Sequence, residues 1–388
     1  MWVSEGSVGR CRNGGWKHIL NDIPFTPAAT AAPRSPKPVV KPAPIEVRDC
    51  IYRELIRISP ATRYRKELIE DPNGLLSRGL LIKDTLNYGA LPPSQRQRAA
   101  LAKSLRSFAK AHFPQYADLA GIPGFWQNDR GESQIWTRHD FNGPMLVIPY
   151  KDELGRIQAC QIRIHPSDIT PDNPKKYRWL SSPDKSCGSS SGTPIHFTFA
   201  PQSLPPGADV ILTEGGLKAD TVASLRSTAH LIATSGVSCS HGLLVTAARP
   251  YNALIGFDSD YRTNPAVCAQ LASLIAAREL DLGKHDLHGL RTSILFWEGQ
   301  KGIDDAVRLK ASISIISIDE WLASLSNDAQ SAVLEIWRDM RYVKNETING
   351  DSSHETTSPI DPNLSHSLDP SYRRLDTFGP NTFGAGRQ

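Results

Sequence analysis

The sequence predicts an α/β protein, in which a mostly parallel sheet domain follows a helical segment and a small β-rich subdomain. Three observations lead to this prediction. Short apolar segments alternate with helical patterns over residues 206–325, as is typical of parallel βα units. Residues 141–205 contain two strand-like segments around a glycine turn, and residues 45–140 repeat apolar positions at helical spacing.

The segments on either side differ in composition. Residues 1–25 are too short to fold alone, and residues 26–44, TPAATAAPRSPKPVVKPAP, form a Pro/Ala linker that favours an extended chain. Residues 326–344 are expected to form a C-terminal helix. Residues 345–388 are rich in Ser, Asp, Pro and Gly, and we expect them to be a disordered tail.

Composition and charge limit the functional classes to which this protein can belong. A formal net charge of +4 over 388 residues permits nucleic-acid binding without requiring it. The 6 cysteines are scattered without a C-x-x-C pair, so we expect neither a zinc site nor a disulfide framework. No apolar run approaches the roughly 20 residues of a membrane span, and no signal peptide is recognised. We therefore expect a cytoplasmic protein without a membrane partner.

The first half of the folded region contains three helical patterns and one hairpin. The helical patterns are VRDCIYRELIRI, SPATRYRKELIED and PSQRQRAALAKSLRSFAKAHF. The third is strongly basic, which fits either a solvated face or a face that contacts phosphates. GPMLVIPYKDELGRIQACQIRIH predicts a hairpin with Gly155 in its turn.

The second half alternates strands and helices. The expected strands are DVILTE, HLIATS, NALIGFD and RTSILFWE, and the helices between them are KADTVASLRS, HGLLVTAAR and PAVCAQLASLIAARELD. Short βα units of this kind predict a mostly parallel sheet covered by helices on both faces.

Carboxylates follow three of these strands. Glu214 ends the first, Asp258 and Asp260 follow the third, and Asp304 and Asp305 follow the fourth. Taken singly, Glu214 is as well explained as a helix-entry residue, and the aspartate pair as a loop feature. Because carboxyl ends of parallel strands share one edge, together they predict a cluster that needs a cation. Oxygen ligands without His or Cys favour Mg²⁺ or Mn²⁺.

The order strand–Glu-Gly, strand–Asp-x-Asp, strand–Gly-x-Asp-Asp over about residues 208–310 resembles the Toprim domain of DnaG-type primases, topoisomerases and related nucleases. The resemblance implies a Toprim-type catalytic domain at 206–325. In it Glu214 would be a general acid/base or metal-associated residue, and Asp258 and Asp260 would bind magnesium. KGIDDAV is similar to a primase segment with a further acidic group, here Asp304 or Asp305.

The resemblance extends upstream of this domain. RGLLIKDTLNYGALP (78–92) and GPMLVIPYKDELGRIQACQIR, followed by KKYRWLSSP, are similar to pieces of the primase catalytic core. Residues 45–320 most closely resemble uncharacterised Toprim-bearing proteins of plasmids and other mobile elements, whose signature lysine and aspartate are matched by Lys218 and Asp220. DnaG-type primases begin with a zinc ribbon, of which residues 1–25 keep Cys11 as a degenerate remnant.

Basic residues of the β-rich subdomain are expected to hold phosphates of nucleotides or template, with solvated surface charges as the alternative. They are Arg163, Lys175, Lys176 and Arg178. Lys218 either pairs with Glu214, contacts a phosphate or is a plain surface residue. Tyr177 and Trp179 either stack on bases or pack in the core.

The resemblance implies a primase-like nucleotidyltransferase that uses Mg²⁺ or Mn²⁺ in the replication of a plasmid or mobile element. Its partners would be a single-stranded DNA template, nucleoside triphosphates and a separate replicative helicase, since the chain has no Walker A motif. The alternatives are a Toprim nuclease or nickase and a non-catalytic single-stranded nucleic-acid-binding protein. The upstream primase-like module favours primer synthesis, while the product, RNA or DNA, stays open.

Overall fold

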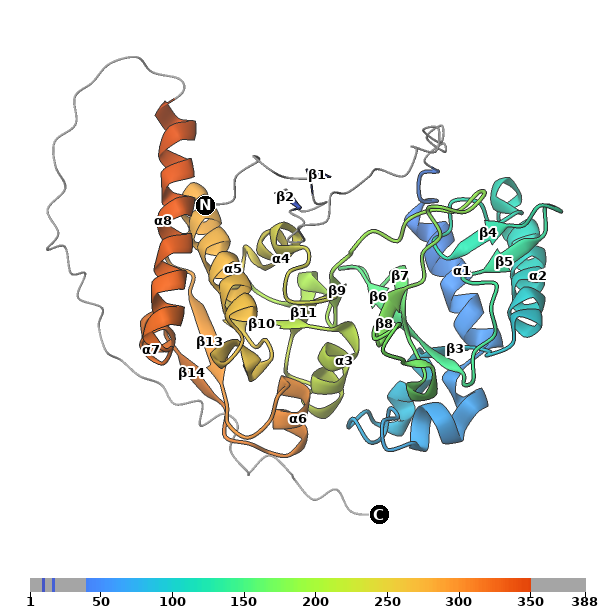
Figure 1. Cartoon of the computed structure of the whole chain (residues 1–388), viewed down its shortest axis with the longest axis horizontal. Coiled ribbons are helices and arrows are strands. Elements are labelled where there is room, and N and C mark those ends of the chain that lie inside the picture. The colour runs from blue at the N-terminus through green and yellow to red at the C-terminus, as the bar shows by residue number, and fades with distance from the viewer. Residues whose placement is uncertain (1–8, 11–15, 18–39, 350–388) are drawn as a thin grey trace, which may run out of the picture. The chain divides into compact units, whose positions relative to one another are not determined.

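The structure, a computed structural model, describes residues 9–10, 16–17 and 40–349 (Figure 1). The chain divides into two compact units, Met1–Val39 and Val40–Gln388. In the first, β1 (Gly9–Arg10) pairs antiparallel with β2 (Trp16–Lys17). The rest of the predicted N-terminal remnant, including Cys11, lies outside the described residues, as do most of the linker and the tail beyond residue 349.

The second unit combines helices with two larger sheets. Its α-helices are α1 (Ile45–Ile58), α2 (Gln95–His112), α3 (Gly216–Leu225), α4 (His241–Ala248), α5 (Pro265–Lys284), α6 (Ile303–Arg308), α7 (Ile318–Ala323) and α8 (Asn327–Asn349). Short 3-10 helices are η1 (Ala61–Tyr64), η3 (Ile82–Asn87), η4 (Pro114–Tyr116), η5 (Pro166–Asp168), η6 (Pro201–Ser203) and η7 (Ser259–Arg262), and η2 (Arg65–Glu70) is a π-helix. Across the described residues, none of the helices is long and apolar enough to cross a membrane.

The larger sheet of the described residues has the strand order β14-β13-β12-β10-β11-β9. Its strands are β9 (His196–Phe197), β10 (Asp209–Glu214), β11 (Leu231–Thr234), β12 (Asn252–Ile255), β13 (Thr292–Phe296) and β14 (Ser314–Ile316). The four central strands are parallel, and β9 and β14 run antiparallel at the edges. The predicted α/β class with a mostly parallel sheet is confirmed.

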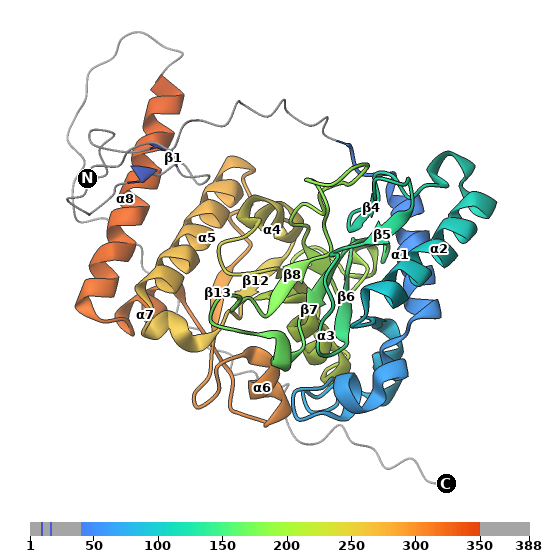
Figure 2. The ribbon, with the colours of Figure 1, turned by 45° about the vertical axis from the view of Figure 1, so that its right-hand side comes forward.

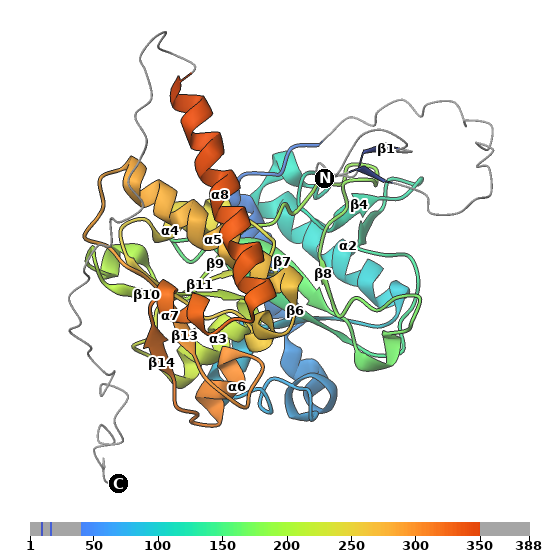
Figure 3. The ribbon, with the colours of Figure 1, turned by 60° about the vertical axis from the view of Figure 1, so that its left-hand side comes forward.

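Helices cover both faces of this sheet. On one face, α4, α5, α7 and α8 share a core with Val210, Leu212 and Ile255. On the other, α3 and α6 pack with Leu254 and Leu295. α8 lies alongside α5, and the indole of its Trp337 donates a hydrogen bond of 2.9 Å to the carbonyl of Ala272 (Figure 3). Because both faces are covered, β10 has three consecutive apolar residues, Val210, Ile211 and Leu212, at its centre.

The smaller sheet has the order β3-β6-β7-β8, with β3 (Gly89–Leu91), β6 (Met145–Lys151), β7 (Ile157–Arg163) and β8 (Tyr177–Trp179). β6 and β7 form the predicted hairpin, with Gly155 at a φ of +75° in its turn. Figure 2 places α3 beside β6 and β7. A separate pair, β4 (Phe125–Gln127) and β5 (Ser133–Ile135), is antiparallel.

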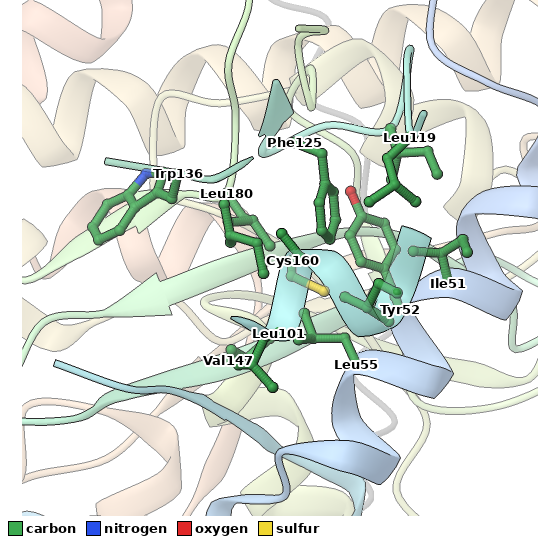
Figure 4. Packing of buried hydrophobic residues seen from close by; sticks show 14 of the residues in the cluster. Ile51, Tyr52, Leu55, Leu101, Leu119, Phe125, Trp136, Val147, Cys160 and Leu180 are labelled. Atoms are coloured by element: carbon green, nitrogen blue, oxygen red, sulfur yellow. The ribbon is translucent and has the colours of Figure 1, made fainter. Parts of the chain in front are cut away.

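A buried cluster joins α1 and α2 to the smaller sheet. Tyr52 and Leu55 of α1 pack with Leu101 of α2, Val147 of β6 and Cys160 of β7 (Figure 4). The phenol of Tyr52 is fully buried and donates a hydrogen bond of 2.8 Å to the carbonyl of Pro123, so its burial leaves no donor unpaired. This core gives the smaller sheet a rigid base.

Three details differ from the expected organisation. Residues 45–140, expected to be helical, also contain β3, β4 and β5. β9 falls in the segment assigned to the β-rich subdomain, yet it pairs with β11 of the larger sheet. α8 continues to Asn349 instead of ending at residue 344. Strands of two or three residues carry too little periodicity to be recognised, and their partners in the sheet decide their conformation.

Candidate functional site

The turn after β10 needs both of its glycines. Glu214 ends the strand, and Gly215 has a φ of +86°, a conformation that side-chain-bearing residues rarely adopt. The N–H of Gly216 donates a hydrogen bond of 3.0 Å to the hydroxyl of Tyr150, and a Cβ on Gly216 would lie 3.0 Å from that ring. The sequence Glu-Gly-Gly thus aims Glu214 at the sheet edge and lets Tyr150 of β6 hold the turn.

The five predicted carboxylates come to the same edge of the larger sheet. Asp258 follows β12, Asp260 lies in η7, and Asp304 and Asp305 begin α6. All except Asp260 line one pocket of about 480 Å³, a volume within the range of small-molecule sites. The expected convergence of these strand ends is therefore present in the structure.

Lys218 of α3 lies between two of these carboxylates. Its ammonium donates a hydrogen bond to Oδ1 of Asp258 and lies 3.6 Å from Oε1 of Glu214. Its side chain is only 13% exposed, so it is a counter-ion enclosed by the site. Burial lowers the pKa of Lys218, but the neighbouring carboxylates outweigh burial and raise it above its ordinary value. Of the three alternatives for Lys218, the structure has it paired with Glu214.

The pKa of two of the carboxyl groups is raised above its ordinary value. Burial raises the pKa of Glu214 to about 7, Lys218 opposes the rise, and Asp258 and Asp260 add to it. Burial also raises the pKa of Asp304, with Lys218 and Arg78 opposing. A group with a pKa near neutrality exchanges protons readily at cellular pH, which suits Glu214 to acid–base chemistry.

Lys301 bridges the aspartates of the Asp-x-Asp motif. Its ammonium lies 2.9 Å from Oδ2 of Asp260 and 3.9 Å from Oδ2 of Asp258, while its side chain is 66% exposed. Within residues 40–349 no three His, Cys, Asp or Glu side chains are grouped so as to hold a metal ion. Three of the carboxylates expected to bind metal ions as one cluster are instead paired with lysines in the structure. An exposed lysine moves away easily, so Asp258 and Asp260 are the pair best placed for a cation.

The same pocket also has basic residues in its lining. Arg78 lies with Nη2 at 4.0 Å from Oδ2 of Asp304, and Lys176 lines the pocket together with Tyr177. Burial lowers the pKa of Lys176, and the nearby guanidinium groups of Arg163 and Arg78 lower it further. A pocket lined by both carboxylates and cations suits a phosphate ester together with a metal ion.

The predicted phosphate-binding residues divide into two groups. Lys176 and Lys218 line the carboxylate pocket. Arg163 is buried, and its Nη1 donates a hydrogen bond of 2.5 Å to the carbonyl of Asn73 beside a different, smaller pocket. Lys175 and Arg178 are not among the described residues that line the carboxylate pocket.

The two aromatic residues of β8 also differ in their surroundings. Tyr177 is half-buried and lines the carboxylate pocket. Trp179 packs edge-on against Tyr150, with ring centroids 4.7 Å apart. Tyr177 is therefore placed to meet a ligand, whereas Trp179 packs against the tyrosine that holds the turn after Glu214.

Four polar residues of the pocket were not predicted as site residues. They are Arg78, Gln161, Ser235 and Lys301. The sequence offered a reason to select Lys301, because it lies in EGQKGIDD just before the predicted Asp304 and Asp305. Arg78 begins the segment RGLLIKDTLNYGALP, but only the folded chain brings it to Asp304.

Similarity to known proteins is found at the level of solved structures. The DnaG primase catalytic domain bound to ssDNA is 17% identical with a TM-score of 0.47, over 79% of this chain and 97% of that chain. A DNA primase domain from Pseudomonas aeruginosa is 18% identical with a TM-score of 0.46, over 72% and 76%. The E. coli primase catalytic core is 16% identical with a TM-score of 0.46, over 78% and 84%. No protein-family profile and no curated protein matches this chain.

Proposed function

We propose that this chain is a primase-like nucleotidyltransferase, which joins nucleotides on a single-stranded DNA template in the replication of a plasmid or other mobile element. The observation that carries the proposal is the pocket that Glu214, Asp258 and Lys218 line together with Arg78 and Lys176. The order of acidic motifs along the chain, which resembles the Toprim domain of primases, supports the same reaction class.

Magnesium or manganese is part of this proposal. Mg²⁺ is commonly held by one or two carboxylates, with water and substrate phosphates completing its shell. Asp258 and Asp260 fit this requirement, because the exposed ammonium of Lys301 already takes the position of a cation between them. The enclosed Lys218 lies beside Oε1 of Glu214 and occupies Oδ1 of Asp258, so Oδ2 of Asp258, next to Lys301, is the oxygen left for a cation. A bound Mg²⁺ would neutralise charge on the phosphates of a nucleoside triphosphate.

The protein's own groups would orient and deprotonate the reactants. Arg78 and Lys176 of the pocket lining would bind the triphosphate, because charge-assisted hydrogen bonds to phosphate are strong. The 3′-hydroxyl of the growing strand would attack the α-phosphorus, and the bond to the β-phosphate would break with release of pyrophosphate. Glu214, with a pKa raised to about 7, would accept the proton of the attacking hydroxyl.

The test is primer synthesis on single-stranded DNA with labelled nucleoside triphosphates and Mg²⁺ or Mn²⁺. Wild type is compared with Asp258→Asn and Glu214→Gln. Asp286→Asn serves as the matched control, because its side chain is 93% exposed and does not line the carboxylate pocket. We expect short products from wild type and the control, reduced at least about 100-fold in both site variants.

Other outcomes identify the alternatives. Cleavage of the template without synthesis would replace the proposal with a nuclease or nickase. Equal binding of single strands by all variants, with neither synthesis nor cleavage, would replace it with a binding protein. A replicative helicase as partner rests on the resemblance, and is tested by whether an added helicase increases primer yield.

A further inference from the structure

A second pocket, of about 500 Å³, lies on the other side of α3 from the carboxylate site. Within the described residues, the two pockets share no lining residue. Its walls come from α1, from η3 and the residues around it, from the β6–β7 turn, from β9 and from α3. Five separate segments therefore enclose a space of a size typical for a small-molecule ligand.

The floor of this pocket is a buried polar network centred on Asp220. The hydroxyl of Tyr88 donates a hydrogen bond of 2.6 Å to Oδ2 of Asp220, and Nε2 of His196 donates one of 2.9 Å to Oδ1. The Lys151 backbone N–H donates to Nδ1 of His196, which leaves the ring proton on Nε2. Asp220 is thus fully engaged, and its negative charge is fixed inside the protein.

Lys218 and Asp220, the lysine and aspartate that follow Glu-Gly in the sequence, therefore lie next to different pockets. Asp220 and Ser224 follow Lys218 by two and six residues within α3. On a helix with about 3.6 residues per turn, these positions lie on the face opposite Lys218. α3 therefore presents Lys218 to the carboxylate site and a polar face to the second pocket, and the proposed reaction uses only the first.

The charge of the second pocket favours an anion. Lys83, Lys151 and Arg53 line it, against the two carboxylates of Asp84 and Asp220. Asp220 is satisfied by its network, and Asp84 accepts a hydrogen bond of 2.5 Å from the hydroxyl of Ser224. Across residues 40–349, neither Lys83 nor Lys151 takes part in an ion pair, although the charge of Lys151 helps to hold the pKa of Asp220 low. Lys83 is thus the cation most available to an anionic ligand, and Lys151 is the second.

The remaining lining offers contacts of other kinds. Phe197 and Phe199 form an apolar side, with ring centroids 6.0 Å apart. Asn87 and Ser227 add exposed hydrogen-bonding groups. Cations, an apolar side and scattered polar groups together match a ligand that carries phosphate, an aromatic ring and hydroxyls.

We propose that this second pocket binds a nucleotide, with its phosphates held by Lys83 and Lys151. The phosphate belongs either to a free nucleotide or to the 5′-end of a strand, and both share the recognised chemistry. The site is separate from the carboxylate pocket, so it exists whether or not primer synthesis is the reaction of the chain.

The test is equilibrium dialysis of the full-length chain against labelled ATP in EDTA, which removes the metal from the carboxylate site. Wild type is compared with Lys83→Ala/Lys151→Ala and with Asp258→Asn, and Lys103→Ala on the exposed side of α2 is the matched control. We expect the double variant to bind ATP about 100-fold more weakly, about tenfold for each charge-assisted contact. Asp258→Asn and Lys103→Ala should bind as wild type does.

Competition distinguishes the two sources of phosphate. Displacement of ATP by a 5′-phosphorylated oligonucleotide, and not by the same strand without its phosphate, supports a strand end. Displacement by neither supports a free nucleotide. Equal displacement by both strands overturns the proposal, as does ATP binding that is lost in Asp258→Asn but kept in the double variant. If the half-buried Lys151 proves necessary for folding, Lys83→Glu at an exposed position must still weaken binding.

Discussion

Lys218 and Asp258 are joined by a hydrogen bond between α3 and the loop after β12, inside the site that Glu214 completes. The two residues are 40 positions apart in the sequence. Their contact links the turn after the first parallel strand to the Asp-x-Asp motif of the third. It also places the buried ammonium of Lys218 among carboxylates. The sequence had predicted a metal ion as the cation that these carboxylates bind.

Lys218→Met is expected to destabilise the protein in the absence of divalent cations. Removing one partner of a buried ion pair costs about 3–5 kcal/mol, because the other charges stay buried without compensation. Urea denaturation in EDTA measures the loss, and Mg²⁺ should restore part of it by replacing the missing charge. Lys103→Met is the control, and as a surface change it should stay within about 0.5 kcal/mol of wild type. A Lys218→Met protein as stable as wild type in EDTA would contradict this role.

Gly215→Ala is expected to destabilise the turn that carries Glu214. The φ of +86° at this position is strained for any residue with a Cβ, at a cost of about 1–3 kcal/mol. Gly242→Ala in α4 is the matched change, since a Cβ at this position would meet no atom within 4 Å and its φ is not positive. In a helix this control should gain about 0.5–1 kcal/mol. Equal effects of the two changes on the unfolding midpoint would rule out the explanation.

Much of the α/β domain follows from the sequence. The alternation of DVILTE, HLIATS, NALIGFD and RTSILFWE with three helical patterns predicted the central parallel strands in their correct places. Because parallel strands share one carboxyl edge, the convergence of Glu214, Asp258 and Asp304 followed as well. Local periodicity and topology rules were enough for both.

Other features depend on long-range contacts that a sequence pattern does not contain. Arg78 meets Asp304 from a segment more than two hundred residues earlier in the chain. Arg163, predicted to face nucleotides, is buried and donates a hydrogen bond to the carbonyl of Asn73, which the folded chain brings to it from 90 residues earlier. β9 has only two residues, and its partner β11 decides which sheet it joins.

Tyr150→Phe is expected to lower both stability and the rate of primer synthesis. The change removes the hydroxyl that accepts from the N–H of Gly216 and donates to Oε1 of Gln161 at 3.1 Å. A buried N–H left without an acceptor costs about 1–3 kcal/mol, and the turn that aims Glu214 loses its support. Thermal unfolding measures the loss of stability, and the synthesis assay measures the loss of rate. Tyr116→Phe in η4, far from the site in sequence, is the control and should change neither the unfolding temperature nor the rate. If Tyr150→Phe also leaves both unchanged, Tyr150 is not a positioning residue.

Asp220→Asn is expected to show a pH-dependent loss of stability. Burial raises the pKa of Asp220, but the hydrogen bonds from His196 and Tyr88 outweigh it and hold the folded pKa below its ordinary value. Such a group stabilises the fold at pH values above the unfolded pKa of about 3.9, and its contribution is lost as pH falls through the folded value. The gap in unfolding free energy between wild type and Asp220→Asn should thus be largest near neutral pH and narrow below about pH 4. A gap that stays constant from pH 7 to pH 3 would contradict the assignment.

The central claim is that Asp258 and Asp260 form the cation site on which the proposed chemistry depends. The most direct measurement is a Mn²⁺ titration followed by electron paramagnetic resonance, with wild type, Asp258→Asn, Asp260→Asn and Lys301→Ala. We predict saturable binding to wild type, a loss of at least about tenfold in affinity in each aspartate variant, and tighter binding in Lys301→Ala because a competing ammonium is gone. Binding that is absent from wild type, or unaffected by both aspartate changes, would contradict the claim.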